Sequence, residues 1–316
     1  MVNLRFKFCF FGIALLIGSF VSLPCNGQTL GPDFVNNYSV IDLGLPAGVP
    51  ASLGGVAFLD NNTLLIGGNA NQASGAIYSI GLTRDPISNF INGFSGPATF
   101  FASAPNIDGG LAFGPGGVLF YTGFPINVIG QIMPGSTAPD KIISLSGNVA
   151  SSVGALQFVP AGFAGAGQMK VASFNTSAWH SVEITPDGNG TFDLTAFSSA
   201  IPLIGGPEGI AFVNGANPGF GVNSVLISEY SDNAVGVYEI DSNGDPILGT
   251  RRIFLTGLSG AEGAAIDPVT GDFIFSTFGG GNRVVVVTGF TVVPEPGSAS
   301  LAALAVILAG FFRRKR

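Results

Sequence analysis

The chain has 316 residues, of which 48 are glycine and 20 are proline, and only 10% are charged. All 19 acidic residues lie between Asp33 and Glu295, so residues 28–296, which hold six basic residues, carry 6 − 19 = −13 charges. This balance excludes nucleic-acid binding, because such a surface repels phosphate. The only cysteines, Cys9 and Cys25, lie near the N-terminus, so the rest of the chain depends on its apolar core.

Residues 1–27 are typical of a signal peptide for the Sec machinery, which would be cleaved before Gln28. Two basic residues precede an apolar stretch at 8–21, and small residues stand just before the expected cleavage site. The basic and small residues concerned are Arg5, Lys7, Cys25 and Gly27. A lipoprotein modified at Cys25 is one alternative, although the residues before it form a poor lipobox. A retained membrane anchor is the other.

Residues 28–292 repeat a unit of four short strands. Each unit opens with a glycine-led apolar strand, at 55–58, 110–113, 154–158, 209–212 and 263–266. A second strand follows a turn, at 64–66, 118–121, 169–172, 225–228 and 273–276. Third strands are visible at 76–80, 235–240 and 283–287, and fourth strands at 98–101, 191–197 and 251–255. The leading glycines are 55, 44, 55 and 54 residues apart, a spacing typical of β-propeller blades.

We therefore predict an all-β fold, a β-propeller of five four-stranded blades. A single sheet cannot bury both apolar faces, so the units must stack around an axis. The fifth unit has no fourth strand of its own, and residues 38–43 form an unassigned strand. We expect this N-terminal strand to pair beside 283–287 and close the ring. A sixth, degenerate blade is the alternative count, and a β-sandwich, or two of them, is the alternative fold.

Three acids, Asp108, Glu208 and Glu262, stand immediately before the first strand of their blades. In a propeller these positions crowd the mouth of the central channel, where like carboxylates could share a divalent cation such as Ca²⁺. The alternative is that the acids are solvated and cap loop turns. The first and third blades offer no acid there, since they have Leu53-Gly54 and Val153-Gly154.

The fourth and fifth units resemble blades of NHL and SMP-30/gluconolactonase-type propellers. The resemblance is carried by residues 207–212 and 261–263, by the strand 225–230, and by an Asn before each third strand, Asn233 and Asn282. It covers about two blades well and weakens over the first three. An SMP-30-type relative would be a metal-dependent hydrolase whose metal is held by such a Glu together with Asn and Asp from other blades. No Asn or Asp here matches those further ligands.

Other candidates for chemistry have simpler structural interpretations. His180, the only histidine, lies in an expected third strand in phase with Val182 and Ile184, so we expect it to pack between blades. The sequence has no nucleophile motif that would accompany a catalytic histidine. Its neighbour Trp179 could instead be a sugar-stacking platform. Residues 187–190 and 241–245 are similar to calcium loops, but the second lacks the full ligand pattern and both lie between strands, so hairpin turns are expected.

The chain ends with three distinctive parts within residues 293–316. They are the motif Pro294, Glu295 and Pro296, an apolar stretch at 298–312, and the basic cluster Arg313, Arg314, Lys315 and Arg316. A 15-residue helix spans about 22 Å, less than the roughly 30 Å hydrocarbon core, so it would insert as a poor permanent anchor with its basic end in the cytoplasm. An ordinary tail anchor is the alternative.

These three parts together resemble the PEP-CTERM sorting signal. The resemblance implies processing near Pro294–Pro296 by exosortase, a membrane-embedded cysteine peptidase, in a Gram-negative host that usually makes exopolysaccharide. It covers about 24 residues and says nothing of the activity of the body.

The sequence thus predicts an exported cell-surface or extracellular-matrix protein with three parts, namely a signal peptide (1–27), a propeller (28–292) and a sorting tail (293–316). Because no catalytic set is assembled, we expect a non-enzymatic binding or structural propeller that presents its rim or channel mouth to polysaccharide, protein or cation. No cofactor other than a divalent cation is indicated. The alternative is a metal-dependent, SMP-30-like hydrolase that uses Glu208 and Glu262.

Overall fold

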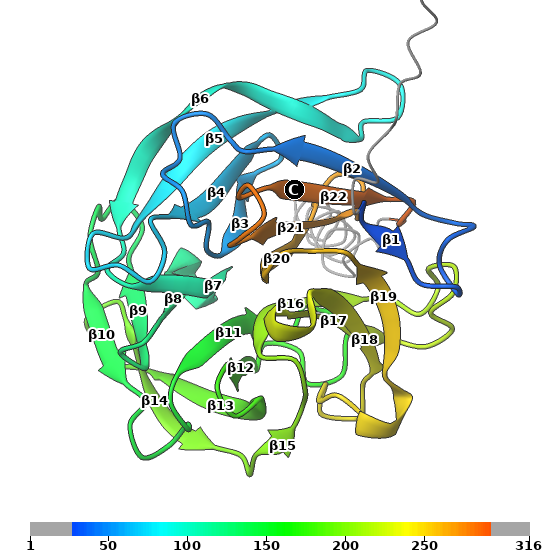
Figure 1. Cartoon of the computed structure of the whole chain (residues 1–316). Coiled ribbons are helices and arrows are strands. Elements are labelled where there is room, and N and C mark those ends of the chain that lie inside the picture. The colour runs from blue at the N-terminus through cyan, green and yellow to red at the C-terminus, as the bar shows by residue number, and fades with distance from the viewer. Residues whose placement is uncertain (1–26, 292–316) are drawn as a thin grey trace, which may run out of the picture.

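The computed structural model describes residues 27–291, and the tail as well as all but the last residue of the predicted signal peptide lie outside them. The described residues form five antiparallel sheets arranged as blades around one axis (Figure 1). The prediction of a five-bladed propeller is confirmed, and the alternatives of a sandwich or a sixth blade are wrong. No helix among these residues has the length and hydropathy needed to span a bilayer.

Each blade begins with its innermost strand and proceeds outward. The first three blades contain β3 (Val56–Asp60), β4 (Thr63–Gly68), β5 (Ala76–Arg84) and β6 (Ile91–Ser103); β7 (Ile107–Phe113), β8 (Leu119–Gly123), β9 (Val128–Ile132) and β10 (Lys141–Ser144); and β11 (Val153–Phe158), β12 (Met169–Ser173), β13 (Ala178–Pro186), β14 (Phe192–Phe197) and β15 (Ile201–Pro202).

The last two blades each take a strand from the N-terminal part of the chain. They contain β16 (Pro207–Val213), β17 (Ser224–Glu229), β18 (Ala234–Glu239), β19 (Arg252–Thr256) and β1 (Thr29–Leu30); and β20 (Ala261–Ile266), β21 (Phe273–Thr277), β22 (Val284–Thr288) and β2 (Ser39–Gly44). Three short 3-10 turns, Pro115–Gly117, Tyr230–Asp232 and Leu248–Thr250, complete the regular structure of the described residues.

The ring is closed by the N-terminal strand, as predicted. β2 pairs antiparallel with β22, with Ser39 opposite Thr288 and Ile41 opposite Val286. The two-residue strand β1, which the sequence did not indicate, pairs with β19 on the outer edge of the fourth blade. The outer edges of these two blades are therefore covered by backbone from the start of the body.

The repeated glycines are explained by contact between backbones around the axis. A Cβ atom added at Gly209 would lie 2.4 Å from the carbonyl oxygen of Glu262, and one added at Gly263 would lie 2.4 Å from the Cα atom of Gly55. No real side chain tolerates such distances. Glycine therefore leads the innermost strands because neighbouring blades touch there through their backbones.

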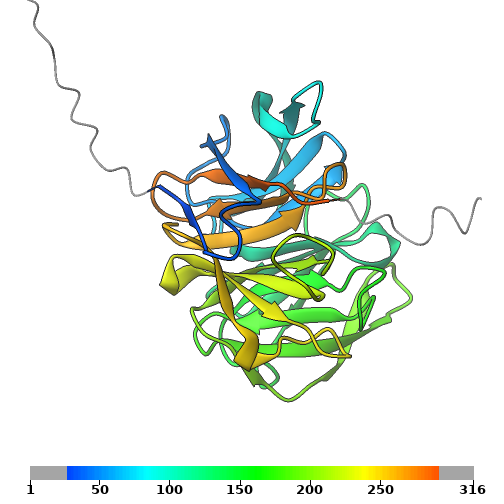
Figure 2. The ribbon, with the colours of Figure 1, turned by 90° about the vertical axis from the view of Figure 1, so that its right-hand side faces the viewer.

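Apolar side chains fill the spaces between adjacent blades. The largest cluster lies between the fourth and fifth blades and includes Phe34, Tyr38, Phe254, Phe273 and Phe290, all at most 6% exposed. The ring centroids of Phe34 and Phe254 are 5.0 Å apart in an edge-to-face arrangement. The residues between β1 and β2 thus join the fourth blade to the fifth. The core as a whole consists of the faces of neighbouring sheets, packed against each other around the axis (Figure 2).

The loops divide the molecule into two ends. Because each blade is an antiparallel meander, loops after the first and third strands gather at one end, which we call the funnel end. Loops after the second strand, and the connections between blades, gather at the other, the acid end.

Every basic residue between 27 and 291 forms a salt bridge. The pairs are Arg84–Asp267, Lys141–Asp187, Lys170–Asp245, Arg251–Glu229, Arg252–Asp33 and Arg283–Asp42. The same residues include 18 acids, so the described body has a formal charge of 6 − 18 = −12.

Candidate cation site on the propeller axis

The three acids occupy the same place in three innermost strands. Asp108, Glu208 and Glu262 are each the second residue of their strand, in β7, β16 and β20. They therefore lie within the first strands and not before them. Each strand has a bulge here: in β16, Pro207 pairs with Glu229 and Gly209 with Ser228, so Glu208 is left as the extra residue. Such a bulge redirects a side chain, in this case toward the axis.

The acids converge as a buried cluster. One carboxylate oxygen from each lies within 4.8 Å of the others. Asp108, Glu208 and Glu262 are only 1%, 3% and 1% exposed, respectively. The acids converge as expected, but they are buried and do not lie at an open channel mouth, and the alternative of solvated acids that cap turns is wrong. Close backbone contacts at the glycines of the innermost strands enclose them.

Four carboxylate oxygens of this cluster have no hydrogen-bond donor. They are Oδ2 of Asp108, Oε2 of Glu208 and both Oε atoms of Glu262. A buried ionised carboxylate without donors or a counter-charge is strongly destabilised. Two carboxyl groups can hydrogen-bond to each other only if one is protonated. The cluster therefore requires either shared protons or a bound cation.

Burial raises the pKa of all three carboxyls. Burial brings the pKa of Asp108 to about 7, although its neighbours Glu262, Glu208 and Asn71 lower this pKa. The pKa values of Glu208 and Glu262 are held well above the usual range, first by burial and then by the neighbouring acidic charges. Because the three carboxyls interact, the loss of a proton from one of them changes the pKa of the other two.

Blade 3 contributes no acid, but it contributes space for the Glu208 carboxyl. A Cβ atom at Gly154 would lie 2.5 Å from Oε2 of Glu208. Gly109 of blade 2 has a similar role, since a Cβ atom there would lie 2.4 Å from the Glu208 carbonyl oxygen. The Val153-Gly154 pair, which has no acid, therefore makes room for the Glu208 carboxyl. A larger residue at Gly154 would therefore displace the Glu208 carboxyl from the cluster.

Asn71, which sequence reasoning missed, adds a polar group from the first blade. It lies between β4 and β5 with a positive φ of 63°, and its backbone N–H donates to the carbonyl oxygen of Ile107, the residue before Asp108, at 3.0 Å. Its buried Oδ1 atom has no hydrogen-bond partner. Asn71 is thus a candidate for a fourth oxygen ligand, since it follows the second strand of blade 1 at the same end as the acids. The sequence could have indicated this residue only through its position in the loop after the second strand, since those loops gather at the acid end.

Aromatic side chains at the acid end form an arc next to these carboxyls. Phe124, Phe174, Tyr230 and Phe278 each follow the second strand of a blade, and all are half-buried. Successive ring centroids are 5.7, 5.5 and 6.1 Å apart. Burial, and after it the charges of Glu262, Glu208 and Asp108, raise the pKa of Tyr230. The first blade has Asn69 at this position.

A second repeated feature positions the innermost strands. Asn127, Asn233 and Asn282 have positive φ angles in the loop after the second strand. Their Oδ1 atoms accept hydrogen bonds from the backbone N–H of Val153, Gly260 and Ser52 at 2.8, 3.1 and 2.7 Å. Each asparagine therefore fixes the chain as it enters the next blade. The sequence signal for this feature is an aromatic residue directly after the second strand, followed three or four positions later by Asn, or by Ser in blade 3.

The remaining candidates have structural roles. His180 is buried on β13, with Nδ1 2.9 Å from the carbonyl oxygen of Ser198, so the packing role is confirmed. Trp179 is fully buried and donates from Nε1 to Asp245, so a sugar-stacking role is wrong. Asp187 and Asp241 accept hydrogen bonds from the backbone N–H two residues ahead, as expected for hairpin turns.

A comparison with protein-family models found no match, and neither did one with curated proteins. Among solved structures, virginiamycin B lyase from Staphylococcus aureus is 14% identical, with 81% of this chain and 100% of that chain covered and a TM-score of 0.41. A PQQ-bound aldose sugar dehydrogenase from Streptomyces coelicolor is 14% identical, with coverage of 78% and 83% and a TM-score of 0.40. A streptogramin B lyase is 11% identical, with coverage of 80% and 98% and a TM-score of 0.41.

These matches are enzymes of different kinds by name. Proteins with one fold commonly differ in activity, so the similarity carries no argument about chemistry. The assignment of a propeller rests on the strand pairing described above.

Proposed function

We propose that the body binds one divalent cation, Ca²⁺, on its axis through Asp108, Glu208, Glu262 and Asn71. The observation that carries this proposal is the set of four buried carboxylate oxygens without donors. Ca²⁺ takes six to eight oxygen ligands and accepts carboxylates in mono- or bidentate form together with amide oxygens. Three carboxylates and one amide supply such a set, and the ion replaces the protons that burial otherwise demands.

The bound ion would be structural. Its four ligands come from blades 1, 2, 4 and 5, so one ion would join parts of the ring that are far apart in the sequence. A catalytic ion must contact its substrate. Acids that are 1–3% exposed leave a substrate no surface to contact, and this favours the non-enzymatic propeller over the SMP-30-like hydrolase.

Calorimetric titration of the EDTA-treated chain with Ca²⁺ at pH 8 tests the proposal. We expect one ion per chain, and loss of binding in the Glu208→Gln/Glu262→Gln double variant. Glu183→Gln is the matched control, because Glu183 is an exposed acid without a salt bridge. No uptake by the unchanged chain, or equal uptake by the double variant, would refute the cation site. Lactone hydrolysis that disappears in the same variant would favour the enzyme.

We further propose that the chain is exported and sorted to the cell envelope surface or the extracellular matrix. The signal peptide at 1–27, the Pro294–Pro296 motif and the basic terminus support this, and they imply the Sec machinery and exosortase as partners. A membrane-inserted intermediate would precede release, with exopolysaccharide as the surrounding material. All strands of the body precede Val293, so a cut near the motif removes none of them.

Mass spectrometry of protein from the envelope of a host with exosortase tests the sorting proposal. We expect a chain that begins near Gln28 and ends close to Pro294–Pro296. Recovery of a chain that still ends at Arg316 would contradict processing.

A further inference from the structure

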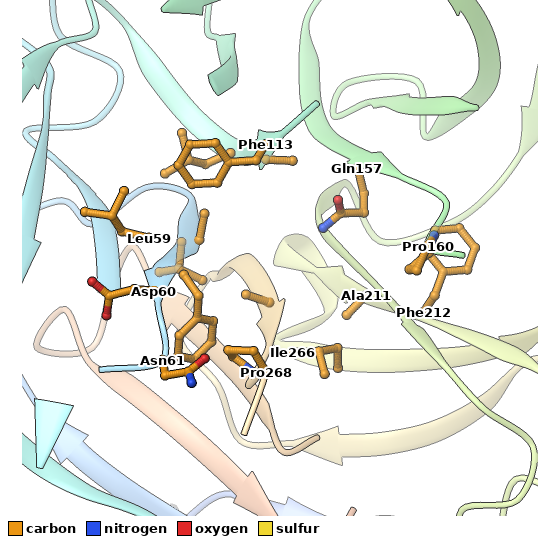
Figure 3. A pocket seen from close by; sticks show the side chains of 16 residues that line it. Leu59, Asp60, Asn61, Phe113, Gln157, Pro160, Ala211, Phe212, Ile266 and Pro268 are labelled. Carbon is orange, nitrogen blue, oxygen red and sulfur yellow. The ribbon is translucent and has the colours of Figure 1, made fainter. Parts of the chain in front are cut away.

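The funnel end holds a hollow on the axis, opposite the acids. It has a volume of about 390 Å³ and is lined by the ends of innermost strands from all five blades (Figure 3). Its walls are mostly apolar and include Phe58, Phe113, Phe212 and Ile266. Hollows of roughly 300–1,000 Å³ hold small ligands or a few side chains. We call this hollow the funnel.

Four acids without basic partners lie at the funnel end. Asp60 lies at its rim, and Asp85, Asp140 and Asp241 lie on other loops of the same end; none of these four is among the salt-bridge partners. Every basic residue from 27 to 291 is already in a salt bridge, so this surface has no cation left for an anionic ligand. The fitting occupant is apolar and positively charged.

Exposed apolar side chains extend this surface onto the loop tips. Ile87 is 91% exposed, and Leu59, Val222, Ile247 and Leu248 are between 40% and 47% exposed. Leu59 lies near the end of β3, and the other four follow a first or third strand, so all five are at the funnel end. Of the five, Leu59 also lines the funnel, so the apolar surface of the hollow continues onto an exposed side chain at its rim.

The described chain leaves the body at this same end. After β22, the N–H groups of Gly289 and Phe290 donate to Asp272 at 3.1 and 3.3 Å, and Thr291 donates from its N–H to Asn217 at 2.9 Å. Asp272 and Asn217 belong to loops after first strands. The next residues in the sequence are a six-residue linker at 292–297, an apolar stretch at 298–312 and the four basic residues 313–316.

We propose that the funnel end is a docking site for this chain's own C-terminal segment, residues 298–316, before that segment enters a bilayer. Apolar side chains of 298–312 enter the funnel and cover the exposed loop tips, and the basic cluster 313–316 meets the acidic rim. The linker can extend to roughly 20 Å, similar to the radius of gyration of about 18 Å expected for a domain of this size, so the segment reaches the axis. The docking is independent of the cation site.

Disulfide trapping tests this docking in the full chain. Cys9 and Cys25 are first replaced by Ser, which leaves a cysteine-free chain. Leu59→Cys at the funnel end is then paired with Val306→Cys in the tail and oxidised mildly without detergent. Ile204→Cys, paired with the same tail variant, is the matched control, because Ile204 is 46% exposed at the acid end and Leu59 is 42% exposed.

We expect a disulfide within one chain for the funnel-end pair, at least five-fold more abundant than for the acid-end pair. Neutralisation of residues 313–316 to Gln should reduce its yield several-fold, and high salt should do the same. Equal yields from both ends would overturn the proposal. Disulfides found only between chains would also overturn it, since they would assign the surface to a second copy.

Discussion

At the three axial acids, burial and proximity change the carboxyl pKa in the same direction. Desolvation is the largest cause at Asp108, Glu208 and Glu262, and the charges of neighbouring acids add to it at Glu208 and Glu262. Shared protons and a bound cation are therefore two alternative ways to provide partners for the same buried carboxylate oxygens. Their balance depends on pH, because a cation must displace the protons.

In the cation-free protein, we expect the Tm to fall as the pH rises from 5 to 7.5. The pKa of Asp108 rises from its ordinary value of 3.8 to about 7 in the folded state. Between these values the folded state binds more protons than the unfolded state, so the free energy of unfolding decreases with pH. Thermal unfolding in EDTA at a series of pH values measures this.

Glu262→Gln provides the control for this pH dependence. The variant removes one like charge, so its Tm in EDTA at pH 7.5 should exceed that of the unchanged chain. In excess Ca²⁺ the order should reverse, because a ligand is lost. The same order of Tm values in both buffers would contradict a shared proton–cation site.

The glycines at the axis make a second prediction at the residue scale. Gly154→Ala should destabilise the fold by roughly 1–3 kcal/mol, as overpacking of a tight site does. The new Cβ would lie 2.5 Å from Oε2 of Glu208 and 2.6 Å from the Pro207 carbonyl oxygen. Gly249→Ala is the control, since nothing lies within 4 Å of its Cβ, and it should change stability by at most about 0.5 kcal/mol. Urea unfolding compares the two variants, and equal stabilities would show that the axis is less tightly packed.

At the scale of elements, buried polar contacts join blades 3 and 4. Lys170 on β12 is fully buried, and its Nζ lies 2.6 Å from Oδ1 of Asp245 and 2.9 Å from the carbonyl oxygen of Asn243, in the loop between β18 and β19. Trp179 and Ser181 on β13 also donate to Asp245. This single carboxylate thus fixes a loop of one blade against two strands of the next.

Lys170→Met should destabilise the protein by roughly 3–5 kcal/mol, because it leaves the Asp245 carboxylate buried without its cation. The Lys170→Met/Asp245→Asn double variant should recover part of this loss, since the uncompensated charge is gone. Chemical unfolding of the two variants provides the measurement. A double variant less stable than Lys170→Met would show that hydrogen bonds to Asp245, and not its charge, dominate.

At the scale of the whole molecule, the propeller depends on a junction between its two chain ends. The fifth blade combines β20, β21 and β22 with β2, which lies more than 200 residues earlier in the sequence. The aromatic cluster around Phe34 and Tyr38 packs at the same junction. The ring is therefore closed by the first residues of the body.

A body that begins at Leu45 should not form a stable monomer, because β22 loses its partner and the aromatic cluster loses Phe34 and Tyr38. A body that begins at Asp33 should remain folded, since it lacks only the two-residue β1. Size-exclusion chromatography and circular dichroism compare the two truncations. A folded, monomeric protein that starts at Leu45 would contradict closure by β2.

The sequence by itself determined the blades, because both causes of the repeat are local. Apolar alternation makes short strands, and glycine must lead each innermost strand wherever two backbones touch. The strand at 38–43 could be assigned to the last blade because that unit lacked a partner. β1 could not be found, since two residues carry no periodicity.

Only the tertiary structure decided what the acids, the aromatic residues and Asn71 do. Asp108 and Glu262 are 154 residues apart in sequence, and they meet because five blades leave a narrow axis. The acids were expected at an open mouth, yet the ring buries them, since glycine backbones close around Glu208. Trp179 was indistinguishable from a surface platform until its burial was known. Whether a side chain is buried, and which others it meets, depends on how many blades share the axis. A local sequence pattern cannot show this, because it describes only one blade.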